Sequence, residues 1–304
     1  MKSSGKAAER GIAMAHQLGG VFTALLTPFD KNNNINEKAL CDLIDFNLKK
    51  GVSGFYVCGS TGEAFLLTEE ERMLVYEIVA KHTAGRAKLL GHIGAVSTDQ
   101  AIRFGKHVEK LGYDAISSVA PFYYKFPLPE VKKYYFDIVD EVNLPMIVYH
   151  IPNFSGVAFS AENFGEFLRD DRFAGVKFTA NDFFSLEQIK TAYPDKVIYN
   201  GFDEMFLAGV SMGADGGIGS TYNFMADKFV KIQKLHAEGK MEEAKAVQQE
   251  ANRIITLLIQ IGVMPAEKEV LNQLGLDFGE CRRPFSSCTE EQKKLIAKEI
   301  IPYI

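Results

Sequence analysis

The residue with the clearest chemical potential is Lys177, which stands in the apolar run "GVKF" between Val176 and Phe178. A buried ammonium group is costly unless a neighbouring group compensates it or the chemistry uses it. Partial removal from water makes a lysine give up its proton more readily, and the neutral amine can form a Schiff base with a ketone. The alternative is a lysine whose ammonium pairs with a carboxylate in the protein interior.

Tyr149 ends the preceding apolar run, "LPMIVYHIP". One predicted helix, residues 160–169, separates the two runs, so we expect neighbouring strands about 4.8 Å apart. The Tyr149 phenol and the Lys177 amine can then meet over one substrate, and the phenol can pass protons to and from it. Alternatively, Tyr149 only packs in the interior. His150 is expected to point the opposite way, towards the helices, with a structural role.

Small and hydroxylated residues follow the second apolar run in "CGSTGEAF", residues 58–65. The glycines let backbone N–H groups approach a ligand, and Ser60 and Thr61 add hydroxyl groups. A turn of this kind before a helix can hold a carboxylate without a basic side chain. Gly-Ser-Thr-Gly turns are common, so the motif is informative only in combination with others.

Two further loops carry polar groups, "YNGFDE" (residues 199–204) and "DGGIGSTYN" (residues 215–223). Asp203 and Glu204 could bind a metal, but no His or Asp nearby supports them, and hydrogen bonds to sugar-like hydroxyl groups fit better. Asp203 could instead cap the helix that follows. Glycine-rich loops after the last strands of a barrel often hold phosphate. Here Ser220 could equally donate a hydrogen bond to a substrate hydroxyl.

The elements that must position these residues alternate regularly along the chain. Short apolar runs alternate with amphipathic helical stretches from Gly20 to about Asn223, which predicts an α/β fold, a (β/α)8 TIM barrel with a C-terminal helical extension. A doubly wound sheet is the alternative, but a GxGxxG fingerprint after the first strand is missing. Active sites of such barrels lie at the carboxyl ends of the strands. Lys88 and Lys196 precede their runs and are expected at the other end, in water.

We expect three segments: residues 1–19 as an N-terminal extension, 20–226 as the catalytic barrel and 227–304 as the helical extension. The last segment is predicted to be helical throughout and to pack on the barrel or form a subunit contact. Within the barrel, Thr68 followed three residues later by Glu71 is a capping-box pattern and predicts a helix start.

Composition argues against several classes of partner. The formal net charge of −5 disfavours nucleic acid, which requires a basic surface. The four cysteines show no metal-binding spacing, so no metal is expected. No apolar run approaches the ~20 residues of a membrane helix, and the first residues are too polar for a signal peptide. We therefore expect a cytoplasmic protein with a small-molecule substrate.

In their order along the chain, "GSTGE", "APFYY", "YHIP", "GVKFT" and "GGIGSTYN" resemble the dihydrodipicolinate synthase family of class I pyruvate-dependent aldolases and lyases. The resemblance covers nearly the whole chain. It implies a Schiff base at Lys177, a proton relay through Tyr149, and a pyruvyl carboxylate held by Ser60 and Thr61. It also implies a homotetramer, in which Tyr123 completes a hydroxyl relay with Thr61 across a subunit contact, and no metal or organic cofactor.

Within the family, the details favour the branch that cleaves sialic acids. The synthases usually carry an arginine shortly after the YNxP segment, where this chain has Phe154, and "YNGFDE" closely resembles the sialic acid branch. Ala120, where many relatives have threonine, is a departure outside the chemistry. The implied reaction is reversible cleavage of N-acetylneuraminate to pyruvate and N-acetylmannosamine. The residues implied to contact the polyhydroxyl part of the sugar are Thr179, Gly201, Asp203, Glu204 and Ser220.

Three other functions stay open. A dihydrodipicolinate synthase-like enzyme, or another 2-keto acid aldolase, would use the same lysine, although Phe154 argues against the synthase. A phosphate-binding barrel isomerase would use the glycine-rich last loop and a carboxylate base, but it leaves Lys177 and Tyr149 unexplained. A non-catalytic sensor of pyruvate-like ligands would not need the full set of chemical groups that the chain carries.

Overall fold

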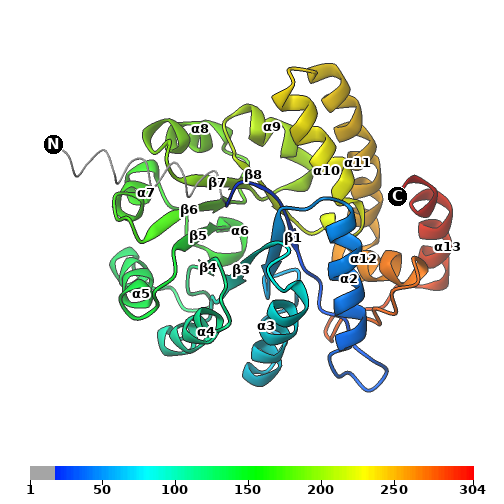
Figure 1. Cartoon of the computed structure of the whole chain (residues 1–304), viewed down its shortest axis with the longest axis horizontal. Helices are drawn as coiled ribbons and strands as arrows, with labels where there is room; N and C mark the ends of the chain where they lie inside the picture. Colours follow the sequence, from blue (N-terminus) through cyan, green and yellow to red (C-terminus); the bar gives the residue numbers. More distant parts are fainter. Residues whose placement is uncertain (1–17) are drawn as a thin grey trace. The chain divides into compact units, whose positions relative to one another are not determined.

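The strands follow one another in chain order around a closed barrel, which confirms the predicted (β/α)8 fold (Figure 1). The structure is a computed structural model that describes residues 18–304, so residues 1–17 of the expected N-terminal extension lie outside it. The strands are β1 (Gly20–Ala24), β2 (Gly54–Val57), β3 (Lys88–His92), β4 (Ala115–Val119), β5 (Met146–His150), β6 (Phe173–Phe178), β7 (Val197–Asn200) and β8 (Gly216–Gly219).

The tertiary contacts group the chain into two units. Among the described residues, unit 1 comprises residues 18–21 and Lys88–Ile218, and unit 2 comprises Phe22–Ala87 and Gly219–Ile304. The expected boundary at residue 226 falls inside helix α10 (Tyr222–Ala237). The division into a catalytic barrel, residues 20–226, and a helical extension, residues 227–304, stays a prediction.

In unit 1, neighbouring strands pair in parallel and their residues are buried almost without interruption. Parallel strands with both faces covered read as continuous apolar runs, which explains the pattern in the sequence. All residues of β6 are buried, including Lys177. The helices of this unit that lie outside its strands in Figure 1 are α4 (Thr98–Lys110), α5 (Leu128–Glu141), α7 (Ala161–Leu168), α8 (Phe183–Ala192) and α9 (Phe206–Ser211). The unit also contains the short helices α6 (Pro152–Ser155) and η1 (Asp203–Met205).

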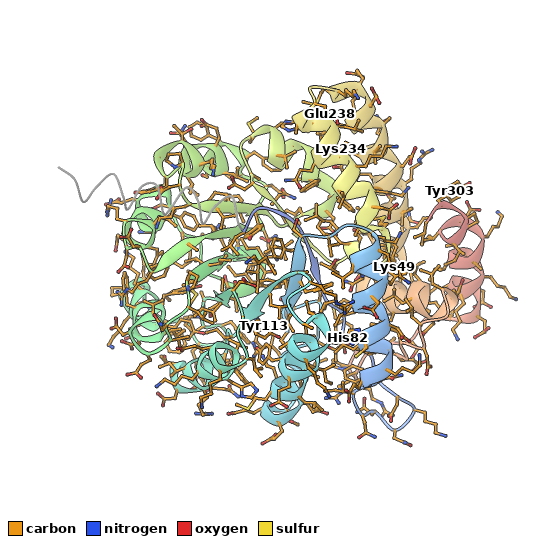
Figure 2. The ribbon with its side chains drawn as sticks, in the orientation of Figure 1. Lys49, His82, Tyr113, Lys234, Glu238 and Tyr303 are labelled. Atoms are coloured by element: carbon orange, nitrogen blue, oxygen red, sulfur yellow. The ribbon has the colours of Figure 1, made fainter. Side chains whose placement is uncertain are left out.

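In unit 2, the predicted capping box at Thr68 and Glu71 is confirmed, and it begins α3. His82, labelled in Figure 2, lies on α3 (Glu69–Thr83), and its Nε2 is 3.0 Å from a carboxylate oxygen of Asp45 on α2 (Glu37–Lys49). The helices of this unit are α2 (Glu37–Lys49), α3 (Glu69–Thr83), α10 (Tyr222–Ala237), α11 (Met241–Ile261), α12 (Val263–Gln273), α13 (Glu290–Glu299) and η2 (Ile301–Tyr303). Within the part of the chain that the structure describes, no helix is long and apolar enough to cross a membrane.

The expectation that the chain is helical throughout from Asp227 is wrong over residues 274–289. Gly275 and Gly279 there adopt positive φ angles of 87° and 68°, a conformation that favours glycine and ends a helix. Pro284, which has no backbone N–H, follows in the same stretch. The interruption has a structural role, because it carries residues that anchor the turn after β2.

The prediction that Lys88 and Lys196 lie in water at the amino ends of their strands is confirmed for Lys88 and wrong for Lys196. Lys88 begins β3, is partly exposed, and pairs with Asp114 at 2.7 Å. Lys196 is buried instead of lying in water, and its Nζ donates to the carbonyl of Phe173 at 2.8 Å. Backbone carbonyls therefore compensate the second ammonium.

Candidate active site

The structure brings Lys177 and Tyr149 together on adjacent strands. The two residues are direct partners in the register of β5 and β6. The Lys177 Nζ lies over the face of the Tyr149 ring, 3.8 Å from its centroid, and is 3.5 Å from Thr179 Oγ1. Only 5% of Lys177 and 4% of Tyr149 is exposed. The electron-rich ring face can stabilise a positive charge at this nitrogen, whether an ammonium or an iminium.

Apolar and aromatic neighbours hold the tyrosine. Tyr149 clusters with Val119, Ile151 and the partly buried Phe122. The ring of His92 meets it edge-on at 5.9 Å, and the Nε2 of His92 accepts a hydrogen bond from the backbone N–H of Val119 at 3.3 Å. Since His92 is fully buried in β3, this contact restricts the orientation of the Tyr149 ring.

His150 points away from Lys177, as its position in the strand predicts. Its ring packs among Phe159, Phe164 and Phe178. Burial lowers the pKa of His150 to about 4, against an opposing effect of Asp182. A histidine with this pKa is neutral near pH 7 and belongs to the apolar packing.

Replacement of Tyr149 by phenylalanine tests the proton relay. The ring and its contacts with Lys177 and His92 would remain, so the imine with pyruvate is still expected to form. Loss of the hydroxyl should lower kcat by about 10²–10⁴-fold, the usual contribution of a general acid–base group. Steady-state kinetics and borohydride trapping measure the two effects. Tyr135→Phe removes another buried hydroxyl, which donates to the Ser118 carbonyl, and serves as the control. Unimpaired turnover in Tyr149→Phe would remove Tyr149 from the relay.

Thr179 and Gly201 are packed against each other beyond the ends of β6 and β7. The Gly201 N–H donates to the Phe178 carbonyl at 2.9 Å. A Cβ atom at position 201 would lie 1.8 Å from Thr179 Oγ1. Glycine is therefore required here, because any side chain would displace the threonine beside the Lys177 amine.

Gly201→Ala is accordingly expected to disturb both stability and catalysis. The added methyl group should destabilise the fold by about 1–3 kcal/mol, as overpacking does, and should lower kcat/KM by displacing Thr179. Thermal unfolding and steady-state kinetics measure these effects. Thr179→Gly combined with Gly201→Ala removes the collision, so the pair should recover part of the lost stability. An unchanged unfolding temperature in the single variant would contradict this packing argument.

The "YNGFDE" segment places Asp203 and Glu204 in the short helix η1, with Asp203 buried and Glu204 partly exposed. The N-cap residues of η1 and α9, Phe202 and Met205, make no side-chain cap hydrogen bond, and the role of Asp203 as a helix cap stays a prediction. A residue that sequence reasoning missed holds this segment. Asn200, buried at the end of β7, donates through Nδ2 to the carbonyl of Phe202 at 2.6 Å. A buried amide at the end of an apolar strand was the available signal.

The hydroxylated turn lies in unit 2, after β2. Ser60 and Thr61 are partly exposed in consecutive turns, in which the Gly62 N–H donates to Gly59 and the Glu63 N–H donates to Ser60. The carbonyl of Gly62 accepts from the Thr27 hydroxyl at 2.7 Å. As predicted, the turn precedes a helix, but α3 begins at Glu69, several residues after Ser60 and Thr61. Any anion held here therefore depends on the turn and its hydroxyl groups.

A buried ion pair anchors this turn, and sequence reasoning missed it. Glu63 has a positive φ of 56° and lies 2.6 Å from the Nζ of Lys268 on α12, with 0% and 1% of the two side chains exposed. The other Glu63 oxygen accepts from the backbone N–H of Arg282 at 2.7 Å. Burial lowers the pKa of Lys268, while Glu63 acts in the opposite direction. The Glu63 carboxylate thus ties the turn to α12 and to residues 274–289.

Ser220 follows β8 directly. Its carbonyl accepts hydrogen bonds from the backbone N–H of Asn223 at 3.1 Å and from the Asn223 side chain at 2.6 Å. Its hydroxyl donates to a carboxylate oxygen of Glu267, on α12, at 2.6 Å. Ser220 is therefore held at both its backbone and its side chain, and Glu267 is a further residue that the sequence did not reveal.

Tyr123 is almost fully exposed, at 86%, and its backbone has a positive φ of 75°. The exposed ring of Tyr124 meets it edge-on at 5.1 Å. A bulky residue in the left-handed region is strained. Two exposed aromatic rings on a strained loop are consistent with a contact surface.

A lysine amine is buried against a tyrosine ring, near the carboxyl ends of adjacent strands of a (β/α)8 barrel, and enzymes that form an imine can use such an arrangement. Residues 17–301 match the model of the dihydrodipicolinate synthetase family. The chain belongs to this family, as the motifs predicted.

The relatives found include sialic acid lyases. The N-acetylneuraminate lyase of Rhizobium meliloti (strain 1021) is 42% identical over 288 residues, 95% of this chain and 96% of the relative. The crystal structure of CdNal from Clostridium difficile in complex with mannosamine is 40% identical, with a TM-score of 0.92 over 94% of this chain and 99% of that chain. The N-acetylneuraminate lyase of Fusobacterium nucleatum complexed with pyruvate is 39% identical, with a TM-score of 0.89 over 94% and 98% of the two chains.

Proposed function

We propose that this protein cleaves N-acetylneuraminate to N-acetylmannosamine and pyruvate in a reversible retro-aldol reaction. The observation that carries the proposal is the buried Lys177 amine over the Tyr149 ring. The N-acetylneuraminate lyases that are 39–42% identical over nearly the whole chain support the choice of substrate. The reaction needs neither a metal nor an organic cofactor, because the imine itself supplies the electron sink.

The first half of the proposed mechanism forms the imine. The neutral Lys177 amine attacks the C2 ketone of the open-chain sugar acid to give a carbinolamine. Tyr149 donates its phenolic proton to the carbinolamine hydroxyl, which leaves as water and gives a protonated imine with Tyr149 as phenolate. The hydroxyl groups of Ser60 and Thr61, with backbone N–H groups of their turn, hold the C1 carboxylate. The carboxylate and the face of the Tyr149 ring both stabilise the positive nitrogen.

The second half breaks the carbon–carbon bond. Tyr149 accepts the proton of the C4 hydroxyl, the C3–C4 bond breaks, and its electrons move into the iminium to leave an enamine. N-acetylmannosamine departs, C3 is protonated, and water releases pyruvate from Lys177. We propose that Thr61 and Tyr123 extend the hydroxyl relay from Tyr149, as the family resemblance implies.

The polyhydroxyl part of the substrate is assigned to the polar residues that follow β6, β7 and β8. Their shared property is hydrogen-bonding capacity at the carboxyl ends of their strands. They are Thr179, Gly201, Asp203, Glu204 and Ser220.

The test is release of pyruvate from N-acetylneuraminate by the purified protein with no metal added. Release that Lys177→Ala abolishes would support the proposal. Formation of a borohydride-trapped pyruvate adduct without release from this sugar would keep the imine chemistry and move the substrate to another 2-keto acid. Absence of both signals would overturn the mechanism. A dihydrodipicolinate synthase-like reaction is disfavoured, because the exposed Phe154 stands where the synthases carry arginine.

We further propose a cytoplasmic homotetramer in which Tyr123 lies at a subunit contact. The Tyr123 ring is 86% exposed in the single chain and would be covered by a neighbouring subunit in the tetramer. Tyr123→Ala removes this contact, so it should weaken subunit association and lower kcat. Sedimentation velocity over a range of concentrations measures the first effect. Tyr303→Ala, at another exposed tyrosine, is the control. A monomeric wild-type protein with full activity would exclude the role of Tyr123 at a subunit contact.

A further inference from the structure

A fully buried carboxylate stands behind the serine assigned to the sugar. Glu267 is 0% exposed, and its Oε1 accepts the hydrogen bond from the Ser220 hydroxyl at 2.6 Å. A buried carboxylate is costly, and an apolar residue at this position of α12 would pack without that cost. The hydroxyl of Ser220 therefore has a partner whose burial costs free energy and which the packing of α12 does not require.

This hydrogen bond fixes what Ser220 can offer to a ligand. A serine hydroxyl has one hydrogen to donate and two lone pairs to accept with, whereas an ionised carboxylate can only accept. Since the hydrogen of Ser220 points to Glu267, the remaining capacity of the hydroxyl is to accept. The expectation that Ser220 donates to a substrate hydroxyl is thus reversed by the geometry.

The serine is also unable to turn away from this arrangement. The side chain of Asn223 holds the Ser220 carbonyl, and the same side chain donates to the Ala24 carbonyl and accepts from the Leu26 N–H. Asn223 is fully buried. The backbone of Ser220 is therefore fixed, and the orientation of its hydroxyl depends on Glu267.

We propose that Glu267 is a positioning and specificity-determining residue, which makes Ser220 an acceptor for a hydroxyl group of the substrate. The assignment rests on the proposed function. It selects ligands that donate at this point, such as a polyhydroxyl chain. It disfavours a phosphate, whose oxygens would meet serine lone pairs with a buried negative charge behind them. The glycine-rich loop after β8 accordingly holds a sugar hydroxyl and not a phosphate.

A double-mutant cycle tests the coupling. Ser220→Ala and Glu267→Gln are each expected to lower kcat/KM for N-acetylneuraminate about 10-fold, mainly through KM. The first variant removes the accepting hydroxyl, and the second replaces a group that can only accept by an amide that can also donate to Ser220, so that the direction of the serine hydroxyl is no longer fixed. The double variant should be no worse than Ser220→Ala alone, since Glu267 acts through the serine. Glu269→Gln, on the same helix, is the matched control. Equal losses from Glu267→Gln in both backgrounds, with a lowered unfolding temperature, would assign Glu267 a purely structural role and overturn the proposal.

Substrate analogues test the direction of the hydrogen bond. Each hydroxyl of the polyhydroxyl chain is replaced in turn by hydrogen or by fluorine, which cannot donate. At the hydroxyl that Ser220 accepts from, both replacements should cost the wild-type enzyme about 10-fold and should cost Ser220→Ala little. If the fluorinated analogue kept its affinity while the analogue with hydrogen lost it, the substrate group would be accepting from Ser220, because fluorine can accept but not donate. That result would overturn the assignment. Wild-type protein that releases no pyruvate defeats the proposed function and this assignment together, whereas active wild type with unchanged Glu267→Gln defeats only the assignment.

Discussion

Replacement of Lys177 by alanine should abolish pyruvate release and the borohydride-trapped adduct while leaving the fold intact. In the proposed mechanism, the Lys177 nitrogen is the only protein atom that forms a covalent bond with the substrate. The loss of activity should therefore exceed the roughly 10²–10⁴-fold effect of losing an acid–base group. Truncation removes a buried amine and leaves the Tyr149 ring in place. Mass spectrometry after incubation with pyruvate and borohydride detects the trapped adduct, and circular dichroism checks the fold.

The control for this variant is another lysine of unit 1. Lys88 lies at the amino end of β3, paired with Asp114, and Lys88→Ala should trap pyruvate as the wild type does. An adduct that persists in Lys177→Ala and maps to a different lysine would refute the assignment of the Schiff base. An unfolded Lys177→Ala would be uninformative about chemistry, so Lys177→Met, which keeps the length of the side chain, is prepared in parallel.

Replacement of Lys268 by methionine should produce the largest loss of stability. Methionine nearly preserves the shape of lysine but removes the ammonium, and it leaves the Glu63 carboxylate buried without its counter-charge. Breaking one partner out of a buried ion pair costs about 3–5 kcal/mol. Affinity for pyruvate should also fall, because Glu63 ties down the turn that carries Ser60 and Thr61. Denaturant unfolding and pyruvate trapping measure the two effects.

The pH dependence and a double variant separate this explanation from simple loss of packing. A buried carboxylate without a counter-charge is more stable when it is protonated than when it is ionised. As pH rises, keeping it protonated costs more free energy, and the folded state of the variant is destabilised further. The difference in stability between wild type and Lys268→Met should therefore be larger at about pH 8 than at about pH 5. Glu63→Gln should restore part of the loss in Lys268→Met. Lys293→Met, which removes an exposed pair with Glu290, is the control and should have little effect. A loss independent of pH would point to packing alone.

The Lys177–Tyr149 pair could be predicted because its determinants are local. Each residue lies near the end of a short apolar run, and the sequence between the runs predicts a helical connection, where the structure has α6 and α7. Successive βα units place the two strands side by side. The alternation of side chains along a strand then puts Tyr149 and Lys177 on one face and His150 on the other. Thr179, Asp203 and Ser220 each come shortly after a predicted strand, so their positions beyond the carboxyl ends of the strands could also be predicted.

The groups that hold the site could not be predicted, because they join segments far apart in the chain. Arg282 contacts Glu63 across 219 positions, and Ser220 contacts Glu267 across 47. Glu267 and Lys268 are ordinary residues of an amphipathic helix in the sequence, and Lys196 is an ordinary lysine beside a strand. Local periodicity records which side of an element is buried, but whether a charged group can be buried depends on partners that only packing supplies. For this reason the Lys177–Tyr149 pair and the barrel follow from the order of the residues, whereas the buried carboxylates that hold the turn and Ser220 follow only from the folded chain.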